Sequence, residues 1–374
     1  METTKSILFE PTKIKNMDLR NRFVRSATYD GCADKNYVTE KQMSLYTSLA
    51  GGGVGLIITG ITYVHDNGHI SKFQNSISSD EFIPGLKQLT AAVHHRGAKI
   101  AVQLFHAGRE ARFPKPGDRI PMGPSFLEVD PYFKADYRAM TESEIWEVIR
   151  AFGDGARRAK EAGFDAVQIH GAHAYLLSQF LSPYTNRRRD EWGGSLENRL
   201  RIHREICNDT RLKVGEDFPV LIKIGVQDGF PGGLEFTEGM LAAKYLAESG
   251  YDGLEISQGL RGPSEEDTEF RTRINVLEHE AYFRNWCRQI KNQVEVPVLM
   301  VGGLRTFTLM EEIIQDEEAD FISLSRPLIR EPNIINDWKR GDHHRAKCIS
   351  CNECFESLIK GKTLECVRLK GKNS

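Results

Sequence analysis

Short runs of apolar residues alternate with longer amphipathic stretches along almost the whole chain. The apolar runs have the length of buried strands, and glycines or prolines near their ends are typical of turns. The stretches between them repeat apolar residues at helical spacing, as in a helix that covers a core with one face. This alternation predicts repeated strand–helix units and therefore an α/β fold with a parallel sheet.

Eight apolar runs qualify as strands. The predicted strands cover residues 23–26, 54–59, 98–104, 165–170, 220–224, 253–257, 298–301 and 321–325. The predicted helices cover residues 40–49, 85–95, 142–162, 196–212, 237–249, 281–294, 307–315 and 327–338. Eight strand–helix units are the number found in a TIM barrel, so we predict an eight-stranded parallel (β/α)8 barrel. A doubly wound sheet is the alternative, but it usually holds fewer strands in an unbroken series.

Two longer stretches interrupt the repeating units. The first, residues 106–140, follows the third predicted strand, and the second, residues 181–195, follows the fourth. An excursion as long as the first is typical of a lid or of a contact between subunits. Directly after the first stretch, Thr141 forms a capping-box pattern with Glu144, which predicts the start of a helix.

Length and charge narrow the class of protein. The 374 residues carry a formal net charge of -2, which argues against binding to nucleic acid or to an anionic membrane. The first residues include an acidic side chain and no long apolar run, unlike a secretory signal. No apolar stretch approaches the roughly 20 residues that cross a bilayer. We therefore expect a cytoplasmic protein without a membrane segment.

Protic side chains gather directly after the fourth predicted strand. His170, His173 and Tyr175 follow one another closely in Ile169-His-Gly-Ala-His-Ala-Tyr175. The carboxyl ends of the strands in a TIM barrel face the active site, so these side chains are expected to converge at one mouth. A single histidine would more often be an ordinary loop residue, but three protic groups at this position favour a functional site.

Further candidates lie at or near the ends of the other predicted strands. They are Ala27 and Thr28 after the first strand, Gly60 after the second, Gln103 in the third, Lys223 in the fifth, Gly302 and Gly303 after the seventh, and Ser325 with Arg326 at the eighth. A glycine pair lets backbone N–H groups approach an anion, and TIM barrels commonly bind phosphate after strands seven and eight. Because Arg326 adds a positive charge there, the sequence predicts a phosphate-binding site.

Lys223 lies within an apolar strand, where an unpaired ammonium group is costly to bury. We expect it to face a negatively charged ligand, with a buried structural ion pair as the alternative. A phosphate site, a cation, the Gln103 amide and the protic cluster suit a phosphorylated planar cofactor beside a carbonyl-bearing substrate. Flavin mononucleotide (FMN) meets these requirements, because Gln103 can hydrogen-bond its pyrimidine edge and Lys223 can stabilise the reduced flavin anion.

Longer motifs extend this interpretation over nearly the whole chain. They are Asn21-Arg-Phe-Val-Arg-Ser26, Gly52-Gly-Val-Gly-Leu-Ile-Ile-Thr-Gly60, Gln103-Leu-Phe-His-Ala-Gly-Arg109, Ile169-His-Gly-Ala-His173, Ser182-Pro-Tyr-Thr-Asn-Arg187 and Asp190-Glu-Trp-Gly-Gly-Ser-Leu-Glu-Asn-Arg199. With these motifs the chain resembles the Old Yellow Enzyme family of FMN-binding TIM-barrel oxidoreductases. The resemblance implies hydride transfer from NADH or NADPH through FMN to the activated C=C bond of an α,β-unsaturated carbonyl or enoyl substrate.

The resemblance also implies a role for each candidate. His170 and His173 would bind the substrate oxygen as charge develops on it, and Tyr175 would donate a proton to the carbon next to the carbonyl. The implied flavin contacts are the backbone of Ala27 and Thr28, the pyrimidine edge at Gln103, the carbonyl side at Lys223, and the phosphate at Gly303 and Arg326.

Four of the seven cysteines crowd the C-terminal tail, at Cys348, Cys351, Cys354 and Cys366. In a reducing compartment this spacing suggests metal or cluster ligation before disulfides. The segment resembles that of the 2,4-dienoyl-CoA reductase and trimethylamine dehydrogenase branch, which implies a 4Fe-4S cluster. A structural zinc site and an empty motif are the alternatives. We accordingly divide the chain into an FMN-binding barrel, residues 1–344, and a cysteine-rich tail, residues 345–374.

We therefore expect an NAD(P)H-dependent ene reductase that acts on small unsaturated molecules. One alternative is a flavin and iron–sulfur dehydrogenase that oxidises an amine or a similar donor, and another is a non-catalytic electron-transfer subunit. The histidines and Tyr175 suit a carbonyl oxygen, whereas a cationic amine favours an aromatic cage, to which Tyr29 and Phe105 can contribute. The excursion and the tail are candidate surfaces for a homo-oligomer or for a separate electron-transfer partner.

Overall fold

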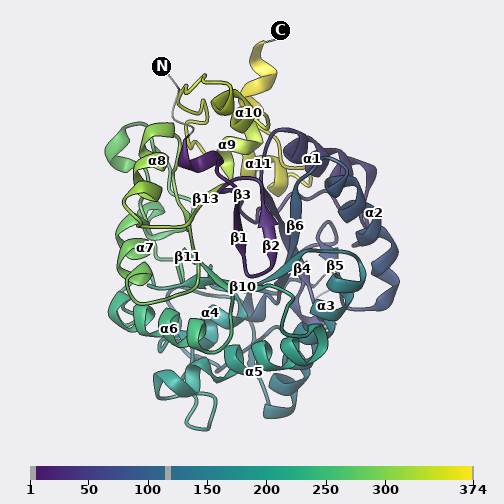
Figure 1. Ribbon diagram of the computed structural model, residues 1–374. Coiled ribbons are helices and arrows are strands. Elements are labelled where there is room, and N and C mark those ends of the chain that lie inside the picture. The colour runs from purple at the N-terminus through teal and green to yellow at the C-terminus, as the bar shows by residue number, and fades with distance from the viewer. Residues whose placement is uncertain (1–5, 114–118, 373–374) are drawn as a thin grey trace.

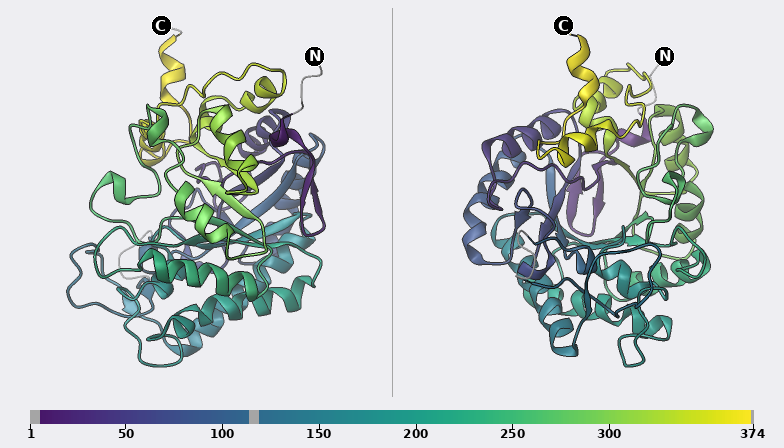
Figure 2. Two further views of the ribbon diagram at one scale, coloured as in Figure 1. Left: turned by 60° about the vertical axis from the view of Figure 1, so that its left-hand side comes forward. Right: turned by 180° about the vertical axis from the view of Figure 1, so that it is seen from behind.

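A closed barrel of parallel strands, surrounded by helices, forms the body of the molecule (Figure 1 and Figure 2). The computed structural model describes residues 6–113 and 119–372. The barrel strands follow one another in chain order, and the last pairs in parallel with the first. The predicted eight-stranded TIM barrel is therefore confirmed. A doubly wound sheet is excluded, because such a sheet is open and has two edges.

Each predicted strand overlaps one strand of the barrel. The barrel strands are β3 (Phe23–Arg25), β4 (Leu56–Tyr63), β6 (Lys99–Phe105), β9 (Ala166–Gly171), β10 (Val220–Gly225), β11 (Gly253–Ser257), β12 (Val298–Val301) and β13 (Phe321–Leu324). The prediction is wrong at the end of β4, which continues through Gly60 and Ile61 and pairs near its end with the short β5 (Asn75–Ser76). Its pairing with β6 shifts register between Ile58 and Ile61, and a bulge of this kind bends a strand without ending it.

Helices cover the outer face of the barrel between successive strands (Figure 1). Those after the first seven barrel strands are α1 (Glu40–Gly51), α2 (Ile83–His94), α3 (Glu142–Glu161), α5 (Leu196–Val214), α6 (Phe236–Glu248), α7 (Arg284–Lys291) and α8 (Phe307–Gln315). The predicted capping box of Thr141 and Glu144 begins α3. The helix predicted over residues 281–294 begins later because Ala281 has a left-handed backbone, with φ of 54°. No helix in the described part of the chain has the length and apolar character to span a bilayer.

The helix predicted over residues 327–338 is wrong as a single element. The structure has two helices there, α9 (Arg326–Arg330) and α10 (Ile334–Lys339). Between them, Pro332 lacks the N–H group that a continuous helix needs. A proline also disfavours helical backbone at the preceding residue, and Glu331 accordingly has φ and ψ of -134° and 75°. The proline therefore ends α9.

A short antiparallel hairpin, which the sequence pattern does not predict, closes the amino-terminal end of the barrel. It consists of β1 (Thr12–Ile14) and β2 (Met17–Leu19), and Figure 1 shows it within the ring of strands. Its apolar side chains are buried against a layer inside the barrel formed by Val24, Leu56, Ile58, Ala101, Ala166, Leu221, Leu299 and Phe321. These residues come from the beginnings of the strands. The polar part of the barrel interior therefore lies at the carboxyl ends.

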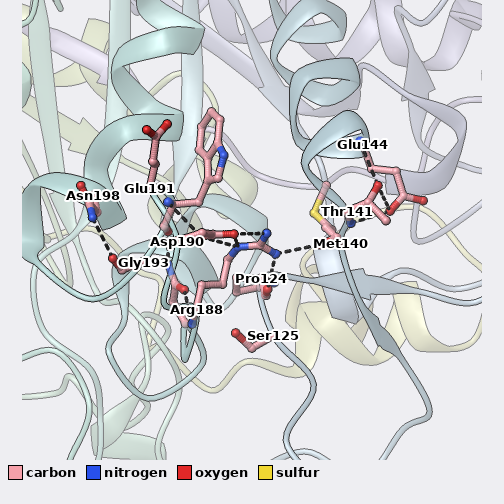
Figure 3. Close-up of polar contacts among 12 residues, drawn as sticks. Pro124, Ser125, Met140, Thr141, Glu144, Arg188, Asp190, Glu191, Gly193 and Asn198 are labelled. Carbon is pink, nitrogen blue, oxygen red and sulfur yellow. Dashed lines mark hydrogen bonds and ion pairs between the residues drawn. The ribbon is translucent and has the colours of Figure 1, made fainter.

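The long excursion between β6 and α3 is fixed to the barrel by Arg188. It contains a short parallel pair, β7 (Met122–Gly123) and β8 (Arg138–Ala139). Arg188, in the loop before α5, donates to the carbonyl oxygens of Pro124 and Met140 at 3.1 and 2.7 Å (Figure 3). An ion pair with Asp190 at 2.6 Å holds the guanidinium group in place. Arg188 therefore joins the loop before α5 to the long excursion between β6 and α3.

The C-terminal tail lies at the rim of the barrel, next to α9 and α10 (Figure 1 and Figure 2). It contains a short α-helix, α11 (Glu353–Ile359), and a 3-10 helix, η7 (Val367–Lys372). Backbone hydrogen bonds join Leu364 to Asp30 at 2.9 Å and Ala346 to Arg305 at 3.0 Å. The tail therefore contacts the loops after β3 and β12, close to the predicted site.

Candidate active site

The predicted cluster of protic side chains is present at the carboxyl end of β9. The ring centres of His170 and His173 lie 5.0 Å apart, and the Tyr175 ring centre is 5.2 Å from that of His170. The Phe105 ring, from β6, packs edge-on against Tyr175 at 4.5 Å. His170 is buried, and Tyr175 is half-buried directly before the short helix α4 (Leu176–Leu181). The structure therefore brings the three protic residues together.

The backbone after β9 is strained. His173 and Ala174 have φ values of 60° and 64°, in a region that residues other than glycine rarely adopt. Their N–H groups donate to the carbonyl oxygens of Gln258 and Gly259, each at 3.1 Å. Strain of this kind costs about 1–3 kcal/mol per residue and collects at functional sites. Here it places the His173 ring beside Ser257, whose Oγ is 2.7 Å from Nε2.

Burial keeps both histidines neutral. It lowers the pKa of His170 well below its ordinary value, and nearby His173 and Lys223 lower it further. Burial likewise lowers the pKa of His173 well below its ordinary value, followed by the charges of Lys223 and Arg261. Each ring at neutral pH therefore has one N–H donor and one acceptor nitrogen. Burial also raises the pKa of Tyr175, so its hydroxyl group keeps its proton. This arrangement can bind an oxygen that gains negative charge and can supply a proton.

A buried hydrogen-bond network crosses the barrel above the apolar layer. Gln103 Nε2 donates to Gln168 Oε1 at 2.7 Å, and Gln168 Nε2 donates to Glu255 Oε2 at 2.8 Å. Lys223 Nζ lies 3.1 Å from the same carboxylate oxygen. Ser26 Oγ connects the two charged groups, at 2.7 Å from Glu255 and 2.9 Å from Lys223. The network is a fixed polar layer, because every member finds a partner in a low-dielectric interior.

Lys223 is therefore held in a buried ion pair, which is the alternative that the sequence leaves open. The sequence analysis missed its partner Glu255 and the connecting Gln168. The sequence does contain a signal for both residues. Gln168 and His170 lie two positions apart in β9, and Glu255 and Ser257 lie two positions apart in β11. Side chains two positions apart in a strand point to the same face, so polar residues at this spacing line the barrel interior.

The predicted phosphate-binding residues surround Tyr282. Gly302 and Gly303 have φ values of 122° and 73°, and a Cβ on them would lie 2.7 and 2.9 Å from the Tyr282 ring. Arg326, at the start of α9, donates to the carbonyl oxygen of Arg271 at 2.7 Å. The buried Nε of Arg271 has no hydrogen-bond partner among the described residues. Two guanidinium groups and a close-packed glycine pair form a donor set that fits a phosphate.

The remaining candidates lie at the carboxyl end of β3 or beside it, on β4 and β13. Thr28 Oγ1 and Ser325 Oγ form a hydrogen bond of 2.8 Å between the ends of β3 and β13. Ala27 packs against the apolar layer inside the barrel. Gly60 lets the chain after β3 come close, because a Cβ there would lie 2.9 Å from the Thr28 carbonyl oxygen.

All four tail cysteines line one cavity. Its volume is about 20 Å³, and its walls include Cys348, Cys351, Cys354, Cys366, Arg326, Arg330 and Arg368. Burial, followed by the nearby Cys348 thiol, raises the pKa of Cys354 to about 11. Asn352 connects this cavity to the phosphate-binding residues, since its Oδ1 accepts from Arg326 at 2.6 Å. Among residues 6–113 and 119–372, no three histidine, cysteine or acidic side chains are arranged to hold a single metal ion.

TIM-barrel enzymes bind substrate and cofactor at the carboxyl ends of the strands, which is where this chain gathers its histidines, its phenol and its phosphate donors. The fold and the position of these residues are those of a TIM-barrel enzyme. Residues 7–344 match the model of the NADH:flavin oxidoreductase / NADH oxidase family. The chain belongs to this family, which confirms the resemblance to the Old Yellow Enzyme family and its dienoyl-CoA reductase branch. The members of this family are flavin-dependent oxidoreductases, with FMN as the cofactor and NAD(P)H as the reductant.

Three relatives illustrate the similarity. An NADPH dehydrogenase of Halalkalibacterium halodurans is 37% identical over 327 residues, which are 87% of this chain and 91% of that protein. The structure of 2-naphthoyl-CoA reductase with 2-naphthoyl-CoA superposes with a TM-score of 0.88 and 26% identity over 96% of this chain and 56% of that one. Histamine dehydrogenase from Rhizobium sp. 4-9 gives a TM-score of 0.84 and 27% identity over 96% of this chain and 52% of that one.

The chain spans about half the length of several relatives. Two curated relatives that match 97% of the chain are covered over only 55% and 53% of their own length. The named relatives include a reductase of an aromatic CoA ester and a dehydrogenase of an amine. Family membership therefore leaves the substrate of this chain to be argued from its own site.

Proposed function

We propose that the chain is an ene reductase. It transfers hydride from NADH or NADPH by way of FMN to the C=C bond of an α,β-unsaturated carbonyl or enoyl substrate. The observation that carries the proposal is the convergence of His170, His173 and Tyr175, with ring centres 5.0 and 5.2 Å apart. Neutral imidazoles can polarise a carbonyl oxygen, and an adjacent phenol can donate a proton to the neighbouring carbon.

The donor chemistry at the mouth of the barrel fits FMN, which supplies the hydride when it is bound. Amide groups and a paired ammonium group line the floor of the site, and guanidinium groups stand at its phosphate end. The proposed cofactor-binding residues are Ala27, Thr28, Gly60, Gln103, Lys223, Gly302, Gly303, Ser325 and Arg326.

The substrate-facing residues then have distinct tasks. His170 and His173 hold the carbonyl oxygen and stabilise the charge that develops on it. Tyr175 Oη gives its proton to the carbon next to the carbonyl, while hydride adds to the carbon beyond. Phe105 packs edge-on against the Tyr175 ring and orients it. Burial of His170 and Phe105 keeps water away from this side of the reacting atoms.

Oxidation of an amine is the second candidate, because aromatic rings gather at the same mouth. Tyr29, Tyr63, Phe105 and Tyr175 belong to one apolar cluster, and an aromatic cage binds cations. However, the guanidinium carbon of Arg261 lies 5.6 Å from the centre of the Tyr175 ring. A cation already occupies that ring face and would repel a substrate ammonium group. Ene reduction is therefore better supported.

An absorbance titration without oxygen tests the proposed function. The flavin bands of the purified protein are expected to bleach with NADH and to return when 2-cyclohexenone is added. Bleaching by histamine in the absence of NADH would support amine oxidation instead. Bleaching by NADH that no enone reverses would contradict ene reduction, and failure to bind FMN after reconstitution would contradict the cofactor assignment.

We also propose that the tail, residues 345–374, holds a 4Fe-4S cluster. Its proposed ligands are Cys348, Cys351, Cys354 and Cys366, which line one cavity together with three arginines. A four-iron cluster binds each thiolate at a different iron atom, so its ligands stand further apart than those of a single ion. The cationic walls suit the net negative charge of a thiolate-bound cluster.

Iron and acid-labile sulfide analysis of protein purified without oxygen tests the cluster. About four irons per chain are expected, as four-cysteine clusters of this type contain. Cys351→Ser is expected to lower the iron content, whereas Cys207→Ser, on α5 far from the cavity, serves as the matched control. Zinc in place of iron, or no metal, would overturn this proposal and leave the barrel chemistry untouched.

A further inference from the structure

A pair of charged side chains lies against Tyr175 from the loop after β11. Arg261 Nε donates to both carboxylate oxygens of Glu269, at 3.0 and 3.1 Å, and Nη2 donates to one of them at 2.7 Å. The guanidinium carbon is 5.6 Å from the centre of the Tyr175 ring. Such two-pronged pairing fixes the plane of a guanidinium group, so Glu269 holds Arg261 in one orientation beside the phenol.

Arg261 is the cation among the groups that face Tyr175. Glu269 approaches from the same loop and Glu110 from the turn after β6, and both carboxylates raise the pKa of Tyr175. Tyr29 follows β3, and the neutral His170 ring lies 5.2 Å away on β9. Burial is the largest cause of the raised pKa of Tyr175, and the positive charge of Arg261 opposes it. Arg261 is therefore a neighbour of the phenol that favours its ionised form.

We propose that Arg261, held by Glu269, is a positioning residue that stabilises the negative charge left on the Tyr175 oxygen during proton transfer. The inference rests on the proposed ene reduction. The Oη–H bond of Tyr175 breaks, the hydrogen forms a bond to the carbon next to the substrate carbonyl, and the electron pair stays on Oη. The guanidinium group offsets this charge until solvent returns a proton. Without it, the half-buried phenol would have to ionise beside two carboxylates.

Glu269 lies close to two residues of the site. Its Oε1 lies 3.8 Å from His173 Nδ1 as well as 2.7 Å from Arg261 Nη2. The carboxylate therefore holds the cation beside the proton donor and also lies next to a histidine of the site, at a distance longer than a hydrogen bond.

Nuclear magnetic resonance of the full-length holoprotein, labelled with ¹³C at the ζ carbon of tyrosine, tests the inference. The Tyr175 signal is identified by its absence in Tyr175→Phe. In Arg261→Gln, the pKa of Tyr175 is expected to rise. In Arg261→Lys, this pKa is expected to stay close to the wild-type value, because lysine keeps the positive charge. Arg157→Gln is the matched control, since that paired arginine is 33% exposed against 30% for Arg261 and lies on α3.

Kinetics provide the second readout. The rate of enone-dependent reoxidation is expected to fall by roughly 10- to 100-fold in Arg261→Gln, as for loss of a nearby compensating charge. The rate of reduction by NADH is expected to stay unchanged, which a collapse of the loop would not allow. An unmoved Tyr175 titration in Arg261→Gln overturns the inference. Failure of the wild-type protein to reduce enones overturns the proposed function instead, because the titration needs no substrate.

Discussion

Replacing Tyr175 by phenylalanine is expected to slow enone-dependent reoxidation by about 10²- to 10⁴-fold, the usual contribution of a general acid. The change removes one oxygen atom and keeps the ring, so the edge-on contact with Phe105 at 4.5 Å is preserved. Reduction by NADH does not use the phenol proton and is expected to keep its rate. Anaerobic stopped-flow absorbance, with the two half-reactions started separately, measures both rates.

A second tyrosine provides the control for this prediction. Tyr251 is buried directly before β11 and donates its hydroxyl to the carbonyl oxygen of His203 on α5 at 2.8 Å. Tyr251→Phe removes the same atom from a structural hydrogen bond and is expected to leave both half-reactions unchanged. Equal slowing in both variants would assign the effect to stability. A wild-type rate in Tyr175→Phe would assign the proton to another group and refute the proposed role.

The barrel could be predicted because its strands are buried on both faces. Such strands appear in the sequence as continuous apolar runs, and their number and spacing indicate the fold. The closing hairpin could not be found this way, because β1 and β2 are three residues long each, too short for a periodic signal. The extension of β4 was missed because Gly60 resembles a turn residue, whereas it allows a bulge and a close approach of Thr28.

The sequence predicts only those residues of the site that lie at the end of a strand. His170, His173 and Tyr175 follow one strand, so chain connectivity alone brings them to the same mouth. Arg261 and Glu269 lie in an irregular loop, where nothing periodic in the sequence indicates that they reach Tyr175. Their position depends on how that loop folds over the barrel, which is set by contacts between distant segments.

Removing Lys223 is expected to lower the free energy of unfolding by about 3–5 kcal/mol, the usual cost of breaking a buried ion pair. Lys223→Met keeps the length of the side chain but leaves Glu255, which is 0% exposed, as an uncompensated charge inside the barrel. Urea unfolding of the protein after removal of FMN measures the effect, because cofactor binding then adds nothing to stability. Removal of Lys213, which pairs with the exposed Asp154, is the control. Its free energy of unfolding is expected to change by at most about 1 kcal/mol.

The double variant Lys223→Met with Glu255→Gln separates the two roles that Lys223 can have. The neutral amide can still accept from Gln168 and meet Ser26, so much of the lost stability is expected to return. A large coupling energy between the two substitutions would show that the ion pair itself is what the fold depends on. An unfolding free energy unchanged by Lys223→Met would contradict this prediction. The ammonium group would then act mainly on the bound cofactor, and its loss would appear in the dissociation constant of FMN.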